Sequence, residues 1–282
     1  MSEQGGASLY EATLKKVASR APAPPPPPRA SAAVVPWRRR PSEDNAVEAY
    51  WVRRSDGLAF MGGWHAFPGG GVAKTDGAVP VHGRPAVTAS SPPRVEAQGP
   101  DLADGVVACA LRELFEETGV LPSVAKAGGP LPTPAALATA REALLDGQPF
   151  AETLASLGAV PDASRLTFAG RWLTPPFAPL RFDNRFFLRG WPASEAVQPS
   201  VIPGELASGE WVPPAAAFAA WQRGDVLAAP PIVYLLQVLA EDGPERGLPR
   251  LLDARETYLG PIRKVELRPG VIMFPLATFT LP

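Results

Sequence analysis

The segment that most constrains this chain runs from Gly105 to Gly119 and reads GVVACALRELFEETG. It predicts one helix that begins near Asp101 or Asp104, either of which can cap free backbone N–H groups. Gly119 is a natural end point, because glycine accepts the left-handed backbone that closes many helices. Apolar residues at helical spacing predict one buried face, made of Val107, Ala110, Leu111, Leu114 and Phe115.

The same predicted helix carries a cluster of glutamates. Glu113, Glu116 and Glu117 stand at positions i, i+3 and i+4, so they share one helical face. Their like charges repel, and a divalent cation such as Mg²⁺ relieves this because it prefers hard oxygen ligands. Arg112 lies four residues before Glu116, where its guanidinium can pair with a carboxylate and fix its orientation. A solvated acidic stripe is the alternative interpretation of the cluster alone.

Composition limits the class of protein and its partners. The chain has 282 residues, of which 46% are hydrophobic, enough to bury the core of one large domain. A net charge of −1 argues against nucleic acid or an anionic membrane as the partner. No stretch reaches the length of a membrane span, and the N-terminus lacks the apolar core of a signal peptide. The single cysteine, Cys109, excludes an internal disulfide, so we expect a cytoplasmic protein.

The two ends of the chain and one internal stretch are set apart by composition. Residues 1–40 are interpreted as an N-terminal extension with a short helix at 7–20 and a proline-rich linker. Residues 72–100, rich in Gly, Pro, Ser and Ala, are interpreted as an inserted, mobile surface loop. Residues 243–282 are interpreted as a C-terminal extension with strand-like segments. The folded domain is therefore expected at 41–242.

Inside this domain the first strand is expected at Asn45–Arg53, where apolar residues supply two faces. Further helices are predicted at 133–146, 150–157, 215–223 and 232–241, and further strands at 165–173 and 181–189. Helices and strands mix without strict alternation. The fold class expected is therefore α/β (α+β), with a mixed sheet packed between helices.

The sequence RELFEETGV, with FPGGGV upstream, resembles the Nudix box, G-x5-E-x7-R-E-U-x-E-E-x-G-U, where U is aliphatic. From Arg112 to Val120 the second half of the box matches without exception. The first half departs in two ways. Its glycine, Gly71 or a neighbour, is separated from the helix by roughly thirty extra residues, and the position eight before Arg112 is Asp104 instead of glutamate. An interrupted box of this kind is similar to the subgroup typified by peroxisomal coenzyme A diphosphatase.

The resemblance implies a Nudix fold with an insertion inside the box, and a hydrolase that needs Mg²⁺, with Mn²⁺ as the alternative ion. Carried over by position, Glu116 and Glu117 would be metal ligands, joined by a backbone carbonyl near Gly70 or Gly71. Glu113 would be either a metal ligand or the catalytic base.

Two further roles follow from the same resemblance. Arg112 would orient the carboxylates of the box. In this family the base can also come from a later loop, for which Glu205 and Glu210 are the candidates. Each of these two has a plain alternative as a surface glutamate.

A second motif concerns the substrate. Coenzyme A diphosphatases often carry LLTxR[SA]xxxRxxxGxxxFPGG just before the box, and here Arg54, Ser55, Gly63 and the FPGG run fall in register. Ala59 stands where that motif has its central arginine. The substrate-binding residues implied are Arg54, Ser55, Phe67, Gly69 and Gly70.

The expected reaction is hydrolysis of a diphosphate linkage in a small nucleoside diphosphate derivative, with coenzyme A or acyl-coenzyme A as the first hypothesis. An ADP-ribose or dinucleotide pyrophosphatase is one alternative. A noncatalytic ligand-binding domain on the Nudix scaffold is another. A homodimer is kept open beside the monomer.

Overall fold

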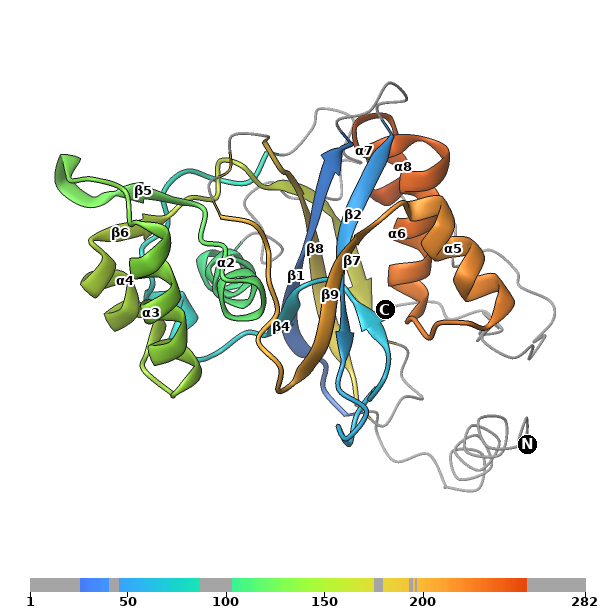
Figure 1. Cartoon of the computed structure of the whole chain (residues 1–282), viewed down its shortest axis with the longest axis horizontal. Coiled ribbons are helices and arrows are strands. Elements are labelled where there is room, and N and C mark those ends of the chain that lie inside the picture. The colour runs from blue at the N-terminus through green and yellow to red at the C-terminus, as the bar shows by residue number, and fades with distance from the viewer. Residues whose placement is uncertain are drawn as a thin grey trace.

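The computed structural model describes residues 26–40, 46–86, 103–174, 180–192, 195 and 197–252. Within them a mixed sheet lies between two groups of helices (Figure 1), which confirms the predicted fold class. None of the helices in these ranges is both long and apolar enough to cross a membrane.

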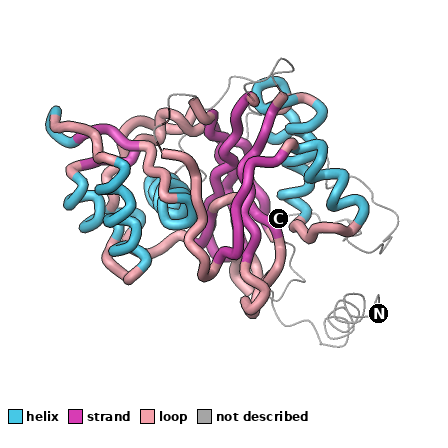
Figure 2. The backbone as a smooth tube through the Cα atoms, in the orientation of Figure 1, coloured by secondary structure: helices cyan, strands magenta, loops and turns pink. Residues whose placement is uncertain are grey.

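The main sheet of the described chain has seven strands, in the order β3-β2-β1-β8-β7, with β4 paired to β1 and β9 paired to β2. Their bounds are β1 Arg29–Arg39, β2 Val47–Arg54, β3 His65–Ala66, β4 Gly69–Gly71, β7 Thr167–Leu173, β8 Phe182–Gly190 and β9 Leu206–Val212. β1 and β8 run parallel, whereas the other pairs are antiparallel. A separate small sheet joins β5 (Ser123–Ala125) to β6 (Ala159–Pro161), as Figure 2 shows beside the main sheet.

The central strand β1 corrects the expected start of the domain. The sequence pattern predicts an extension over residues 1–40 and a first strand at 45–53. That assignment is wrong for 29–39, because β1 lies between β2 and β8 and its residues 31–36 are buried. A strand covered on both faces shows a continuous apolar run instead of alternation. Here the run ASAAVVP begins one residue after the proline run, so the sequence pattern does not set it apart from the linker.

β1 and β2 diverge along their length, and the glycine-rich turn at Gly69–Gly71 lies in the gap between them. They pair only where Trp37–Arg39 meets Val47–Ala49. Beyond that, β3 pairs with β2 and β4 pairs with β1, so the segment between them fills the gap. Gly69 lies so close to β1 that a Cβ would stand 2.4 Å from the carbonyl oxygen of Ala32. Only glycine fits this approach.

Helices cover both faces of the sheet. One group consists of α2 (Asp104–Thr118), α3 (Pro134–Leu145) and α4 (Phe150–Leu157), and the other of α5 (Pro214–Arg223), α6 (Pro230–Glu241), α7 (Gly243–Arg246) and α8 (Leu248–Leu252). Helices α3 to α6 fall within two residues of the predicted ends. α7 and α8 extend the domain beyond the expected end at 242, since Leu248, Leu251 and Leu252 are buried in the main core.

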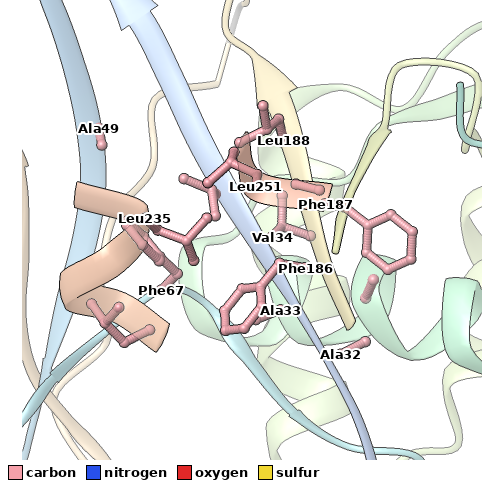
Figure 3. Packing of buried hydrophobic residues seen from close by; sticks show 14 of the residues in the cluster. Ala32, Ala33, Val34, Ala49, Phe67, Phe186, Phe187, Leu188, Leu235 and Leu251 are labelled. Carbon is pink, nitrogen blue, oxygen red and sulfur yellow. The ribbon is translucent and has the colours of Figure 1, made fainter. Parts of the chain in front are cut away.

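The main core forms where α6 and α8 meet the strands (Figure 3). Leu235 of α6 and Leu251 of α8 pack with Phe186, while Phe67 of the glycine-rich segment belongs to the same buried cluster. Each such side chain contributes roughly 1.5–3 kcal/mol on burial. The core therefore fixes the segment that leads into β4.

The first half of the expected mobile insertion is part of the fold. Residues 76–78 form a short 3₁₀ helix, η1, and Val79 is buried. His82 bridges to Asp162, and Ala86 bridges to the first residue of β7. The rest of that insertion, the helix expected at 7–20 and the strand-like segments after residue 252 lie outside the described residues.

A bulge in β7 gives a first prediction. Gly170 has φ +111°, and a Cβ there would stand 2.6 Å from the carbonyl oxygen of Leu251 in α8. Gly147 has φ +98° and open space around it. We expect Gly170→Ala to lower the free energy of unfolding by about 3 kcal/mol, and Gly147→Ala by about 1 kcal/mol, because only the first adds a clash to the backbone strain. Urea denaturation measures both, and equal losses would contradict the packing of α8 on the bulge.

Candidate active site

Helix α2 carries the predicted carboxylates and has the predicted buried face. Its five expected core residues are all at most 1% exposed. It ends at Gly119, whose φ of +75° and N–H bond to the carbonyl of Phe115 at 2.8 Å confirm the predicted stop. The predicted cap is wrong, because Ala103 occupies that position and Asp104 is the first helical residue.

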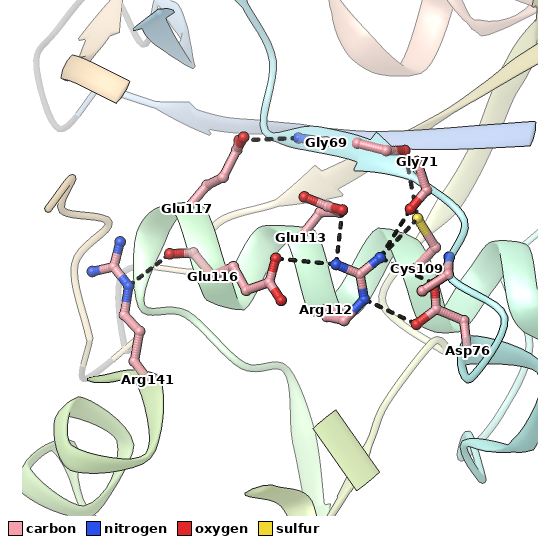
Figure 4. A network of polar contacts seen from close by, with 11 residues as sticks. Gly69, Gly71, Asp76, Cys109, Arg112, Glu113, Glu116, Glu117 and Arg141 are labelled. Atoms are coloured by element: carbon pink, nitrogen blue, oxygen red, sulfur yellow. Dashed lines mark hydrogen bonds and ion pairs between the residues drawn. The ribbon is translucent and has the colours of Figure 1, made fainter. Parts of the chain in front are cut away.

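Arg112 is the centre of a hydrogen-bond network on this helix (Figure 4). Its guanidinium donates to both carboxylate oxygens of Asp76, at 2.9 and 3.0 Å. It also donates to Glu113 at 2.8 Å, to Glu116 at 3.0 Å and to the backbone carbonyl of Gly71 at 3.0 Å. The bidentate pair is charge-assisted and shielded, since Asp76 is fully buried. Arg112 therefore ties the face of α2 to the glycine turn.

Two of the glutamates touch the glycine turn directly. Glu117 accepts a hydrogen bond from the N–H of Gly69 at 3.1 Å. The carboxylate of Glu113 lies against Gly70, where a Cβ would meet its oxygen at 2.5 Å. The acidic face is thus packed on the turn and is not a stripe spread into solvent.

Arg141 supports the end of α2 from the neighbouring helix α3. Its Nε donates to the backbone carbonyl of Glu116 at 2.8 Å, and its side chain is buried. A cation here complements the negative end of the helix dipole, which the glutamates themselves oppose. The sequence pattern does not indicate this role of Arg141, because nothing near it in the chain points to α2.

The glutamates are electrostatically strained. The pKa of Glu113 is raised to about 7, chiefly by burial and also by the nearby Glu116, against the opposing effect of Arg112. Burial also raises the pKa of Glu116. The pKa of Glu117 is raised well above its ordinary value, chiefly by burial and also by the nearby Glu113. Three carboxylates, those of Asp76, Glu113 and Glu116, thus share the Arg112 guanidinium.

This donor set fits a hard divalent cation in charge and in ligand type. In the ranges that the structure describes, no three His, Cys, Asp or Glu side chains converge as a metal site. In Figure 4 one nitrogen of Arg112 donates to both Glu113 and Glu116, whereas Glu117 turns toward Gly69.

Comparison with known proteins places this arrangement in a family. Residues 79–239, more than half of the chain, match the family described as the NUDT19 Nudix domain. The chain belongs to the Nudix family. The human protein named acyl-coenzyme A diphosphatase NUDT19 is 29% identical over 236 residues, which are 71% of this chain and 62% of that relative. The chain thus matches less than two thirds of that relative's length.

A solved structure supports the fold. The crystal structure of a Nudix hydrolase from Alicyclobacillus acidocaldarius is similar with a TM-score of 0.65 and 28% identity. The match covers 78% of this chain and 94% of that one. The Nudix fold of this chain is therefore established by sequence and by structure.

The structure identifies the missing carboxylate of the Nudix box. Counting backward from Arg112 suggested Asp104, but the residue that pairs with Arg112 is Asp76. Counted forward from Gly70, the pattern G-x5-E ends at Asp76. The interruption therefore follows this carboxylate, and the spacing from the glycine was the signal that sequence analysis overlooked. The carbonyl of Gly71, expected as a metal ligand, accepts from Arg112.

Three other predicted site residues meet beside the glutamates. Arg54 lies 3.1 Å from the carboxylate of Glu205, and Ser55 donates to the backbone of the same loop. Glu205 contributes to the raised pKa of both Glu116 and Glu117, and Arg54 opposes it at Glu117.

Two predicted site residues lie elsewhere. Glu210 stands opposite Trp51 in the β2–β9 pair and accepts its indole N–H at 3.2 Å. Trp51 stacks on His65, whose N–H bonds to the carbonyl of Leu227 just before α6, so Glu210 is on the sheet face away from α2. Phe67 is 2% exposed in the main core. The structure brings neither residue to the glutamates.

Replacing Asp76 tests the network. We expect Asp76→Asn to lower the free energy of unfolding by about 3 kcal/mol, because it leaves the Arg112 guanidinium with a neutral partner in a buried site. Asp104→Asn is the matched control, with an expected change of about 0.5 kcal/mol or less. Chemical denaturation of both variants decides which aspartate completes the box.

The pKa of Glu113 predicts a pH effect in metal-free buffer. This pKa rises from 4.5 to about 7 on folding, so the folded state holds an extra proton between these values and loses stability as pH rises through 7. Glu113→Gln cannot ionise. We expect it to be more stable than wild type at pH 8 by about 1–3 kcal/mol, and similar at pH 5. A loss of stability at pH 8 in thermal unfolding with EDTA would contradict this.

Proposed function

We propose that this chain is a Mg²⁺-dependent hydrolase that cleaves the diphosphate linkage of a small nucleoside diphosphate derivative. The proposed substrate class is coenzyme A or acyl-coenzyme A. The observation that carries the proposal is the packing of the three-glutamate face of α2 against the turn at Gly69–Gly71. Membership of the Nudix family and the 29% identity to a protein named as an acyl-coenzyme A diphosphatase support it.

Glu113, Glu116 and Glu117 are the residues that would hold the metal in this proposal, with Mn²⁺ as an alternative ion. A bound divalent cation neutralises charge on a diphosphate and acidifies water for attack. Arg112 keeps the carboxylates on one side of α2 by its bonds to Glu113 and Glu116. Its own position depends on the buried Asp76.

Arg54 and Glu205 supply the other groups that the reaction needs. The Arg54 side chain is partly exposed beside the glutamates, so its guanidinium can donate to a phosphate oxygen. The side chain of Glu205 is 65% exposed beside the glutamates. A solvent-facing carboxylate in this place can accept the proton of an attacking water. Glu205 is therefore our choice for the base, in place of Glu210.

One residue favours a second substrate class. Ala59, exposed in the β2–β3 connection, stands where the coenzyme A motif has its central arginine. A side chain without charge cannot hold the extra phosphate that an arginine would bind. ADP-ribose or a dinucleotide is therefore the second candidate substrate.

The metal role is tested by Glu117→Gln, which keeps the shape of the side chain and removes its charge. We expect Mg²⁺-dependent turnover to fall at least about a hundredfold, because a carboxylate ligand is lost. We also expect Mg²⁺ to raise the melting temperature of wild type but not of the variant. Glu152→Gln, on α4, is the matched control and should behave as wild type. Unchanged activity in Glu117→Gln would refute the metal role assigned to Glu117.

The substrate is identified by the mass of the products. Purified protein is incubated with Mg²⁺ and, in separate reactions, with coenzyme A, acyl-coenzyme A, ADP-ribose and a dinucleotide. Cleavage of the diphosphate of coenzyme A yields 3′,5′-ADP and a phosphopantetheine product. Absence of 3′,5′-ADP together with turnover of ADP-ribose or the dinucleotide would assign the second class.

A further inference from the structure

Two distant segments are joined at the end of β2. The N–H of Ser55 donates to the carbonyl of Glu205 at 2.9 Å, and the Ser55 hydroxyl donates to the carbonyl of Gly204 at 2.6 Å. The neighbouring Arg54 reaches the Glu205 carboxylate at 3.1 Å. Three contacts from two consecutive residues thus converge on one dipeptide that is 149 positions away.

Arg54 and Ser55, which make these contacts, follow a backbone that is held by hydrogen bonds. Arg54 is held by backbone bonds across the β2–β3 connection, donating to Trp64 at 2.9 Å and accepting from Gly63 at 3.1 Å. The pairing of β2 with β9 shifts register between Arg53 and Arg54. Such a bulge redirects the chain at the end of a strand. It places the residues before Leu206 over Ser55.

The segment that leads to Glu205 is also tied to α2. The N–H of Ser200 donates to the carbonyl of Thr118, next to the last glutamate of the helix, at 2.9 Å. Val201 packs against the buried cluster of Tyr50, Val52 and Leu206. The backbone at Glu205 is therefore fixed from both sides, while its carboxylate remains open to solvent.

The ion pair of Arg54 and Glu205 contributes little to stability, because the carboxylate is exposed and water screens the pair. The geometric effect of the three contacts is larger. We propose that Ser55 and Arg54 form a clamp that holds Glu205 beside the glutamate face of α2, with Ser55 as a positioning residue that acts through Glu205. This inference rests on the proposed function. It replaces the expectation that Ser55 binds substrate.

The first test separates positioning from substrate binding. We expect Ser55→Ala to lower kcat roughly two- to tenfold, the effect of one hydrogen bond, with KM unchanged. Ser55→Thr keeps the hydroxyl and should restore kcat. Ser156→Ala is the matched control, because it also removes a hydroxyl bond to a backbone carbonyl, in α4 at 2.8 Å. A rise in KM with unchanged kcat would overturn the proposal in favour of substrate contact.

The second test asks whether Ser55 acts through Glu205. In a Glu205→Gln background we expect Ser55→Ala to cause no further loss of kcat, because the positioned group is already disabled. Independent, multiplying losses would overturn the proposal, and so would full activity of Glu205→Gln. Amide hydrogen exchange gives a readout without turnover: Ser55→Ala should speed exchange in residues 202–206, and Ser156→Ala should not.

These experiments distinguish the absence of the clamp from the absence of the proposed hydrolase activity. If wild type hydrolyses no diphosphate with Mg²⁺ or Mn²⁺, the proposed function fails, whereas the exchange experiment still reports on the clamp. If wild type is active and Glu117→Gln is not, but the Ser55 and Glu205 effects are independent, the clamp alone is refuted.

Discussion

The ion pair between Arg112 and Asp76 is the interaction on which this site depends. The two residues are 36 positions apart, yet the pair is shielded from water and anchored by two hydrogen bonds. Burying two charges is costly unless geometry and further hydrogen bonds compensate. Here the same guanidinium also serves Glu113, Glu116 and the carbonyl of Gly71. The pair therefore holds the guanidinium that joins the acids of α2 to the glycine turn.

The strongest parts of the sequence prediction rest on helical periodicity. The buried face of α2, its end at Gly119 and the shared face of its glutamates follow from spacing within one element, and the structure has all of them. β1 was missed because a strand buried on both faces lacks alternation and this one adjoins prolines. Asp76 is not predicted by the spacing counted backward from the helix, because an insertion separates the two.

Other site features depend on tertiary structure, which local pattern does not contain. Glu205 and Glu210 are alike in residue type and only five positions apart. The first precedes β9 and lies by α2, whereas the second is inside the strand and points to the opposite face. A shift of one residue in strand register would move such a side chain to the other face of the sheet. Arg141 likewise reaches the end of α2 only because α3 folds against it.

The interruption of the Nudix box begins and ends at nearly the same point in space. Gly105, in the first turn of α2, packs so closely on η1 that a Cβ would stand 3.2 Å from the backbone nitrogen of Gly77. A connection whose two ends lie close together does not strain the elements that it joins. Doubling its length costs only about 0.6 kcal/mol of closure entropy. Residues 79–86 are bound into the fold by buried Val79 and by the bridges of His82 and Ala86, so only the chain between residues 87 and 102 can change in length while the network around Arg112 stays in place. This segment is therefore where the length of the chain can vary during evolution, and where a reporter domain can be inserted.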